Sequence, residues 1–380
     1  MRILIATEVA RQKEAGTAGV LLNYAKELQM RGHSVESWFA EDLLPTAQTG
    51  RRFASLALAI RVAKRIMEAR GQYDVVILHA PVGCVYGLWR KLFKPAGGPP
   101  YVFVMQGILE RYALAMRREN RKGRAWHFGW KNQAWFRYYH RPLYECAIRT
   151  ADYGVASNRE AWTYPELRYD LDPGRLWYVP NGTDESFFIS RHYETKPPLR
   201  LLYVGTWLDR KGVHYLVEAF RIVLQQRSDI ELTVAGCLSS EESIKSACPA
   251  EVRDRIRVRP FVNRDDMPAL YCEHDIFLLP SLMEGMPLAL MEAMATAMPV
   301  ITTETSGMAD VVEDGFNGLL VLPADAEALA RAIIRLCDSL KLRESLGQEA
   351  QRTMRRYTWS CVTRKLEMVL SLAAKGEAAH

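Results

Sequence analysis

Short apolar runs alternate with longer amphipathic segments along the first half of the chain. The runs are rich in Val, Ile and Leu, as expected for strands buried on both faces of a parallel sheet. The segments between them repeat apolar residues at helical spacing. This alternation predicts a parallel sheet with helices on both faces. The predicted strands are Ile3–Ala6, Ser34–Phe39, Val75–His79 and Tyr101–Met105, and the predicted helices span about Gly19–Arg31 and Leu56–Ala69.

The second half repeats this pattern, so the chain is expected to form two doubly wound α/β halves rather than one continuous sheet. Open sheets of this kind bind ligands beyond the carboxyl ends of their strands, and two of them facing each other would create a central cleft. The predicted strands are Leu201–Val204, Glu231–Ala235, Arg255–Arg259, Ile276–Leu279, Val300–Thr303 and Leu319–Val321, with helices near Val213–Gln226 and Trp359–Leu372.

A polar segment separates the two halves. It reads PNGTDESFFISRHYETKPPL and ends in the pair Pro197-Pro198, which favours extended, linker-like backbone. We place the boundary within residues 186–198, giving a first Rossmann-like domain of residues 1–190 and a second of residues 191–358. The last helix, at about residues 359–373, could pack back onto the first domain.

The composition is typical of a soluble globular protein with two domains, since 380 residues are 49% hydrophobic and 25% charged. Seven cysteines are scattered without a CxxC pair, which predicts reduced thiols in the cytoplasm, with no disulfide and no structural zinc. The N-terminal residues lack the apolar core of a signal peptide, and no uncharged apolar stretch is long enough to span a bilayer.

The net charge of +6 is unevenly distributed. Residues 1–190 carry 27 Lys and Arg against 18 Asp and Glu, whereas residues 191–380 carry 23 against 26. The excess is concentrated in Arg111–Arg141, where nine basic residues and one acidic residue are interleaved with aromatic ones. This segment could contact an anionic membrane surface or acceptor, or could be a solvated helical face whose aromatics pack onto the domain. No nucleic-acid-reading motif accompanies it, so nucleic acid is not an expected partner.

Candidate chemistry begins at GTWLDRKG, which follows the predicted strand Leu201–Val204. Gly205 allows close approach of a ligand to the backbone, while Arg210 and Lys211 offer a forked donor and a point charge to a diphosphate. The alternative is an exposed basic pair. Because cations at a helix N-terminus are electrostatically unfavourable unless an anion binds there, we predict an anion site at this loop.

Two carboxylates stand in otherwise apolar surroundings after the strand Ile276–Leu279: Glu284 in a loop and Glu292 in the helix that follows. That helix is expected to open with Pro287, a residue that suits a first helical turn. Buried carboxylates need polar partners, and the free amides of a helix N-terminus favour negative charge nearby. Phosphates and sugar hydroxyls fit this environment, whereas structural capping and core hydrogen bonding are the alternative.

Further glycines could bring backbone amides to a ligand. Gly16 and Gly19 belong to a predicted loop between the first strand and the first helix. Gly307 follows the strand Val300–Thr303, although Ser306-Gly307 is first interpreted as a turn. The chain contains neither GxGxxG nor GxxxxGK[ST], which argues against a dinucleotide-dependent oxidoreductase and against a P-loop NTPase.

Several motifs stand out in chain order: VPNGTDESFF, GTWLDRKG, SLMEGMPLALMEAMATAMPVI and DGFNGLLV. Together they resemble the retaining GT-B-fold glycosyltransferases of family 4, also called glycosyl transferases group 1. Glu284 and Glu292 match the E-x7-E element of that family. The resemblance implies two Rossmann-like domains facing a cleft, and transfer of a sugar from a nucleotide-diphosphate sugar with retained anomeric configuration. It implies no metal and no cofactor.

Carried over by position, the resemblance implies a role for each candidate residue. Glu292 would accept hydrogen bonds from the donor ribose, and Glu284 would face the donor sugar. Arg210 and Lys211 would neutralise the leaving diphosphate. Further donor contacts are expected at Gly205, Gly285, Met286, Pro287, Leu288 and Gly307, at the Gly16–Gly19 loop and, beside the base, at Val262.

One position departs from the family pattern. After the strand Tyr101–Met105 many relatives have a His-Gly pair, whereas this chain has Gln106-Gly107. Gln can hydrogen-bond a sugar hydroxyl but cannot carry a proton as His does. His79, at the end of the preceding strand, is a candidate substitute that could contact the acceptor or the sugar, although an interior His with satisfied hydrogen bonds is the commoner case.

The expected activity is that of a metal-independent hexosyltransferase that moves sugar from a UDP- or GDP-sugar to a glycan or lipid-linked acceptor, in surface polysaccharide or glycolipid assembly. The second domain would hold the nucleotide and the first the acceptor, with peripheral contact through Arg111–Arg141 to the inner face of the membrane. The alternative is a catalytically weak or inactive nucleotide-sugar-binding scaffold of the same fold, which Gln106 motivates. A related epimerase or phosphorylase has less support, because no pyridoxal-lysine or phosphate motif is evident.

Overall fold

The computed structural model of this chain describes residues 1–11, 16–45, 53–69, 71–93, 98–124, 128–194 and 198–376. The chain divides into two compact units, each with its own parallel sheet. The first unit contains Met1–Leu109, His127–Asn181 and Trp359–His380, and the second contains Glu110–Trp126 and Gly182–Thr358. The second unit therefore includes a segment from the first half of the chain.

The sheet of the first unit has six parallel strands in the order β2-β1-β3-β4-β5-β6. All four predicted strands of this half are confirmed, and two more were missed. The missed ones are short, and one contains Gly154, where a Cβ would lie 2.1 Å from the Phe103 ring of the neighbouring strand. The strands are β1 (Arg2–Ala6), β2 (Ser34–Trp38), β3 (Val75–His79), β4 (Tyr101–Met105), β5 (Tyr153–Ala156) and β6 (Leu176–Tyr178).

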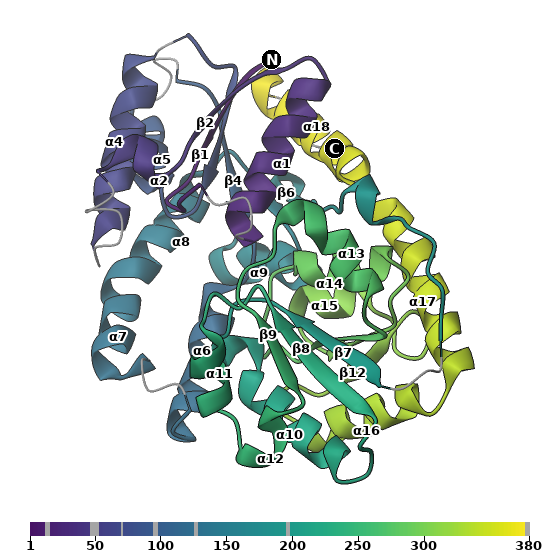
Figure 1. Ribbon diagram of the computed structural model, residues 1–380. Helices are drawn as coiled ribbons and strands as arrows, with labels where there is room; N and C mark the ends of the chain where they lie inside the picture. Colours follow the sequence, from purple (N-terminus) through teal and green to yellow (C-terminus); the bar gives the residue numbers. More distant parts are fainter. Residues whose placement is uncertain are drawn as a thin grey trace. The chain divides into compact units, whose positions relative to one another are not determined.

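Helices of the first unit cover this sheet with their apolar faces. In α4, for example, Leu58, Val62 and Ile66 follow helical spacing and are buried. The C-terminal helix α18 packs beside α1 within this unit (Figure 1), where Trp359 meets Tyr24 edge-on at 5.8 Å. The helices are α1 (Gly16–Met30), α2 (Ala40–Leu43), α4 (Ala54–Glu68), α5 (Cys84–Leu92), α7 (Trp130–Trp135), η2 (Phe136–His140), α8 (Arg141–Thr150), α9 (Arg159–Tyr169), η3 (Pro173–Arg175) and α18 (Trp359–Lys375).

The basic, aromatic segment Arg111–Arg141 is divided between the two units, at residues 126 and 127. In the first unit its aromatic residues differ in burial. Phe128 and Phe136 are buried, whereas Trp130 and Tyr138 are each 75% exposed. Aromatic docking onto the fold is thus confirmed for only part of the segment; Trp126 lies outside the described residues.

The sheet of the second unit also has six parallel strands, in the order β12-β11-β10-β7-β8-β9. All six strands predicted for this half are confirmed. The order reverses between β7 and β10, which is the switch point where doubly wound sheets bind their ligands. The strands are β7 (Leu199–Val204), β8 (Ile230–Ala235), β9 (Ile256–Arg259), β10 (Ile276–Leu279), β11 (Val300–Thr303) and β12 (Leu319–Val321).

Helices of the second unit pack on both sides of its sheet, with α10 against α16 (Figure 1). The helix α14 contains an almost continuous run of buried residues, as expected for a helix enclosed by the fold. The helical elements are α6 (Leu109–Arg121), η4 (Glu185–Phe187), η5 (Asp209–Lys211), α10 (Val213–Leu224), α11 (Glu241–Ser246), α12 (Ala250–Arg253), η6 (Arg264–Asp266), α13 (Met267–Cys272), α14 (Leu288–Ala295), α15 (Ser306–Val311), α16 (Ala326–Cys337), α17 (Leu340–Met354) and η7 (Arg355–Tyr357).

Helix α6 is held in the second unit by a buried carboxylate. Glu119, the one acidic residue of the Arg111–Arg141 segment, is 3% exposed and accepts a hydrogen bond from the hydroxyl of Tyr215 in α10, 2.9 Å from Oε1. Lys122 donates to both groups, at 3.1 Å to Glu119 and 2.7 Å to Tyr215. The guanidinium of Arg124 lies 4.8 Å from the centre of the Tyr215 ring. This cluster compensates a buried charge that would otherwise be costly.

Candidate functional site

The loop that follows β7 is shaped by two glycines with left-handed backbone. Gly205 has φ of +149°, and Gly212 has φ of +71°. Between them, Arg210 and Lys211 form a single 3-10 turn that leads into α10. A Cβ on Gly212 would lie 1.9 Å from the carbonyl oxygen of Pro280, directly after β10. Only glycine therefore allows the loops after β7 and β10 to pack this closely.

Glu284, in the loop after β10, joins the predicted cations of the loop after β7. Its Oε1 lies 2.8 Å from Nη1 of Arg210 and 2.7 Å from Nζ of Lys211. Ser281 donates to the same carboxylate oxygen at 3.3 Å. The side chains of Glu284 and Lys211 are 10% and 12% exposed, so this is a largely buried ion pair, and Arg210 is more open at 31%. Three predicted site residues thus meet at the switch point.

The sequence predicts that these two cations need an anion nearby, and Glu284 supplies one from within the protein. Burial alone would raise the pKa of Glu284, but Lys211 and Arg210 outweigh it and lower that pKa. Burial lowers the pKa of Lys211, only partly opposed by Glu284. With all three groups ionised, the cluster carries one net positive charge. It can therefore accept a further anion without facing net repulsion.

Gly307 serves the packing of a third loop. It lies in the first turn of α15, and a Cβ there would lie 1.8 Å from the carbonyl oxygen of Gly285. The residues Met286 and Pro287 are buried beside it. Pro287 precedes α14 as its N-cap rather than opening the helix, so Leu288 is the first helical residue, one position later than predicted. The extended ψ of 120° at Pro287 accounts for this shift.

Glu292, in α14, is 3% exposed and has partners that the sequence did not reveal. The Tyr271 hydroxyl donates to its Oε2 at 3.0 Å, and Arg264 donates to its Oε1. Arg264 also pairs with Asp184 at 2.7 Å. The available signal for Arg264 was its place two residues after Val262, the candidate base contact, which is half-buried between β9 and η6. Core hydrogen bonding, the alternative for Glu292, is therefore present.

The remaining candidate residues belong to the first unit. Gly16 and Gly19 form the first turn of α1, so their assignment to a loop is wrong. Residues 12–15, which precede this helix, lie outside the described part of the chain. The first-turn amides of a helix still have no intrahelical acceptors.

His79 ends β3, beside the switch point of the first sheet between β1 and β3. Burial lowers the pKa of His79, Glu8 opposes that effect and His140 adds to it. His140 Nε2 lies 3.8 Å from Oε1 of Glu8. Gln106 follows β4, and both its Nε2 and the Nδ1 of His79 are buried without a hydrogen-bond partner among the described residues. His79 is thus not a fully satisfied interior residue.

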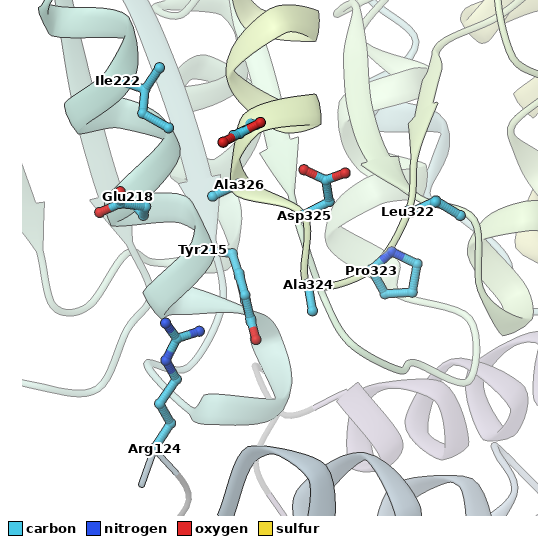
Figure 2. Close-up of a pocket in the computed structure, with 10 residues that line it drawn as sticks. Arg124, Tyr215, Glu218, Ile222, Leu322, Pro323, Ala324, Asp325 and Ala326 are labelled. Carbon is cyan, nitrogen blue, oxygen red and sulfur yellow. The ribbon is translucent and has the colours of Figure 1, made fainter. Parts of the chain in front are cut away.

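A surface cavity of 560 Å³ lies elsewhere in the second unit, between α10 and the start of α16. Figure 2 shows Tyr215 and Asp325 on either side of it, with Arg124 below. No predicted site residue lines this cavity. Across the described ranges, no three His, Cys, Asp or Glu side chains gather to hold a metal ion, and no helix is long and apolar enough to cross a membrane.

Two family profiles match the chain in succession. Residues 15–187 match "Glycosyltransferase Family 4", and residues 183–353 match "Glycosyl transferases group 1". Among curated relatives, the amylovoran biosynthesis glycosyltransferase AmsK of Erwinia amylovora is 36% identical over 159 residues, covering 40% of this chain and 39% of AmsK. The putative colanic acid biosynthesis glycosyltransferase WcaL of Salmonella typhimurium is 27% identical over 239 residues, covering 60% and 59%. The chain thus spans about two to three fifths of these relatives' length.

Solved structures resemble the whole chain. Sucrose-phosphate synthase from Thermosynechococcus elongatus has a TM-score of 0.79 at 15% identity, with 99% of this chain and 100% of that chain covered. HepE from Anabaena, solved in complex with UDP and glucose, has a TM-score of 0.70 at 17% identity, covering 98% and 100%. At these identities the likeness concerns the fold, which is GT-B. With both profiles and this fold, the chain belongs to the GT-B glycosyltransferases of family 4.

Proposed function

We propose that this protein transfers a hexose-type sugar from a UDP- or GDP-sugar to a glycan or lipid-linked acceptor, with retention of anomeric configuration and without a metal ion. The observation that carries the proposal is the cluster of Arg210, Lys211 and Glu284 at the switch point of the second sheet. Two cations on one carboxylate leave a net positive charge where a doubly wound sheet binds ligands. A nucleoside diphosphate is the anion that this site would hold.

The part of the reaction that most needs stabilisation is departure of the nucleoside diphosphate. As the bond between the anomeric carbon and the diphosphate oxygen breaks, negative charge develops on that oxygen and the sugar becomes oxocarbenium-like. Arg210 and Lys211 would stabilise that charge, which is where fixed cations lower a barrier most. The acceptor hydroxyl then bonds to the anomeric carbon on the same face, and its proton passes to the departing phosphate oxygen. No protein nucleophile is required, so Glu284 and Glu292 would bind and orient the donor.

The acceptor would occupy the first unit. His79, Gln106 and Glu8 follow or end its central strands at the carboxyl edge. Among the described residues, His79 and Gln106 each have a buried nitrogen without a hydrogen-bond partner, which a sugar hydroxyl would satisfy. Gln106 would contribute a hydrogen bond rather than a proton transfer. Retention with proton transfer to phosphate requires no titrating side chain at that position. Gln106 is therefore compatible with an active enzyme.

The names of relatives support a role in polysaccharide assembly. AmsK is named for amylovoran biosynthesis and WcaL, putatively, for colanic acid biosynthesis. On the basis of these names, we propose that this chain acts in surface polysaccharide or glycolipid synthesis at the inner face of the membrane. The exposed Trp130 and Tyr138 of the Arg111–Arg141 segment could support peripheral contact with anionic lipid. Sedimentation with anionic but not neutral vesicles, lost in Trp130→Ser, would test that contact.

The decisive test of activity is release of nucleoside diphosphate. Purified protein is incubated with UDP-, GDP- and ADP-sugars and a panel of glycan and lipid-linked acceptors, after a thermal-shift screen selects the donor. Release of the nucleoside diphosphate together with a retained-configuration glycoside is expected. Nucleotide binding without release or transfer across the panel would favour the scaffold instead.

A further inference from the structure

Arg264 lies between two carboxylates of the second unit. One terminal nitrogen donates to Oε1 of Glu292, and the other donates to Oδ2 of Asp184 at 2.7 Å. The guanidinium carbon lies 4.9 Å from the centre of the Phe187 ring, which meets Tyr271 edge-on at 5.9 Å. A planar guanidinium can serve two acceptors in fixed directions while stacking on a ring, which an ammonium group cannot do equally well.

The partners of Glu292 leave part of its hydrogen-bonding capacity unused. Arg264 donates to one oxygen and the Tyr271 hydroxyl donates to the other, at 3.0 Å. An ionised carboxylate offers about four lone-pair sites, so about two remain. Two adjacent hydroxyls, as on the ribose of a nucleotide, match that remaining capacity. The same carboxylate without a cation would be an uncompensated charge at 3% exposure, which is strongly unfavourable.

The charges support Arg264 as a permanent cation. Burial alone would lower the pKa of Arg264, but Glu292 and Asp184 outweigh it and raise that pKa. Asp184 and Phe187 belong to the segment that follows the crossing from the first unit into the second at residues 181 and 182. One guanidinium therefore connects the carboxylate in α14 to the start of the second unit.

We propose that Arg264 is a positioning residue for the donor nucleotide, because it orients the Glu292 carboxylate so that this group accepts the ribose hydroxyls. Through its contact with Asp184, Arg264 also couples ribose binding to the segment at residues 182–188. The inference rests on the proposed function, because it takes Glu292 as the ribose-binding group. Arg264 itself need not touch the nucleotide.

The test compares ribonucleotides with their 2′-deoxy counterparts, using UDP and dUDP, GDP and dGDP, and ADP and dADP. For the pair whose ribonucleotide binds best, the wild type should prefer the ribonucleotide by about tenfold in Kd, the equivalent of one hydrogen bond to a charged group. Arg264→Gln should lose most of that preference while its Kd for the deoxynucleotide changes less than about threefold. A merely structural role would weaken both nucleotides equally, and that result would overturn the proposal.

Glu292→Gln and Asp184→Asn are the matched variants. If no nucleotide binds the wild type, the proposed function fails and this inference with it. If Glu292→Gln keeps the full preference, Glu292 is not the ribose-binding group and the inference alone is overturned. If Glu292→Gln loses the preference and Arg264→Gln keeps it, the inference alone is overturned. Should Arg264→Gln not fold, Arg264→Lys keeps the charge without the fork and is expected to lose at least about threefold of the preference; full retention would contradict the proposal.

The coupling to the linker segment has its own measurement. On addition of the selected ribonucleoside diphosphate, hydrogen exchange in a peptide covering residues 182–188 should slow in the wild type. Asp184→Asn keeps the contact between Arg264 and Glu292, so it should keep the ribose preference but lose most of this slowing. Equal slowing in Asp184→Asn would overturn the coupling.

Discussion

Lys211 Nζ lies 2.7 Å from Oε1 of Glu284, and the two side chains are only 12% and 10% exposed. This ion pair joins the loop after β7 to the loop after β10, at the point where the order of the second sheet reverses. Arg210 pairs with the same oxygen at 2.8 Å. A diphosphate entering here would find cations already fixed in place, so little reorganisation would be needed as charge develops on the leaving group.

Removing one of these cations should affect turnover more than binding of the acceptor. Arg210→Ala and Lys211→Ala are each expected to lower kcat by about 10²–10³-fold, because each removes a charge that stabilises the leaving diphosphate. The KM for the acceptor should change little. Lys245→Ala is a matched control, since Lys245 pairs with Glu241 in α11 and lies in the same unit. Unchanged kcat in both site variants would remove this assignment.

Glu284→Gln should lower stability in a pH-dependent way. Because the folded-state pKa of Glu284 lies below its ordinary value of 4.5, the ionised group contributes stability above that pH and loses it as the pH falls through the folded-state pKa. At pH 7 the variant should lose about 3 kcal/mol of unfolding free energy, since two cations lose their buried partner. Denaturant titrations should show this difference shrinking below pH 4.5. A difference that is constant from pH 7 to pH 3 would contradict the ion pair.

Gly212→Ala separates backbone strain from steric overlap. Gly212 and Gly315 have nearly equal φ values of +71° and +74°, but only Gly212 faces another atom, the Pro280 oxygen at 1.9 Å from an added Cβ. Gly315→Ala should cost about 1 kcal/mol from left-handed backbone alone. Gly212→Ala should cost at least about 2 kcal/mol more, because the backbone of the two loops must move apart. Equal losses in thermal or denaturant unfolding would show that the loops do not meet this closely.

The contact between Glu119 and Tyr215 should hold α6 in the second unit. Glu119→Ala is expected to destabilise by about 3 kcal/mol, because Lys122 loses a partner and the buried Tyr215 hydroxyl loses its acceptor. In native-state hydrogen exchange, the amides of residues 110–121 should exchange at the same rate as those of α10 in the wild type. In the variant they should exchange faster than those of α10. Lys122→Ala, which removes a half-exposed side chain, should have the smaller effect. Protection of residues 110–121 that is independent of Glu119 would refute this anchoring role.

Transfer activity should survive complete chelation. The proposed site neutralises the diphosphate with Arg210 and Lys211, so a divalent ion has no assigned role. Turnover after exhaustive EDTA treatment should remain within about twofold of the untreated enzyme, and Mg²⁺ should not restore the activity of Lys211→Ala. A strict requirement for Mg²⁺ would mean that the charge on the leaving group is handled differently.

Strands and motifs could be predicted here because their signals are local. Apolar runs such as Ile276–Leu279 and Val300–Thr303 coincide with the observed strands. Lys211 and Glu284 each lie in a short motif that resembles the family. The partners of Glu292 could not be predicted, because Arg264 lies 28 residues before it in the chain and Tyr271 lies 21 residues before it. Arg264 in turn pairs with Asp184, a further 80 residues back. The predicted loop at Gly16 and Gly19 is wrong, because α1 begins at Gly16 and accommodates both glycines near its start although glycine is a poor helix former.

Helix α6 marks the other limit of local reasoning. The sequence of α6 does not show which sheet it packs on, and nothing in the sequence indicates that Glu119 pairs with Tyr215, 96 residues later. Likewise, the short strand Tyr153–Ala156 contains Gly154, because any larger residue there would overlap the Phe103 ring of the neighbouring strand. Such choices depend on long-range packing.

The most direct test of the diphosphate site compares the affinity of the protein for a nucleoside monophosphate and the matching diphosphate, such as UMP and UDP, by calorimetry. The wild type should bind the diphosphate at least about 10²-fold more tightly, since two charged hydrogen bonds contribute about 1.5–3 kcal/mol each. The double variant Arg210→Ala/Lys211→Ala should bind both nucleotides with nearly equal affinity. If the double variant still prefers the diphosphate as strongly as the wild type does, the β-phosphate binds elsewhere and the account is wrong.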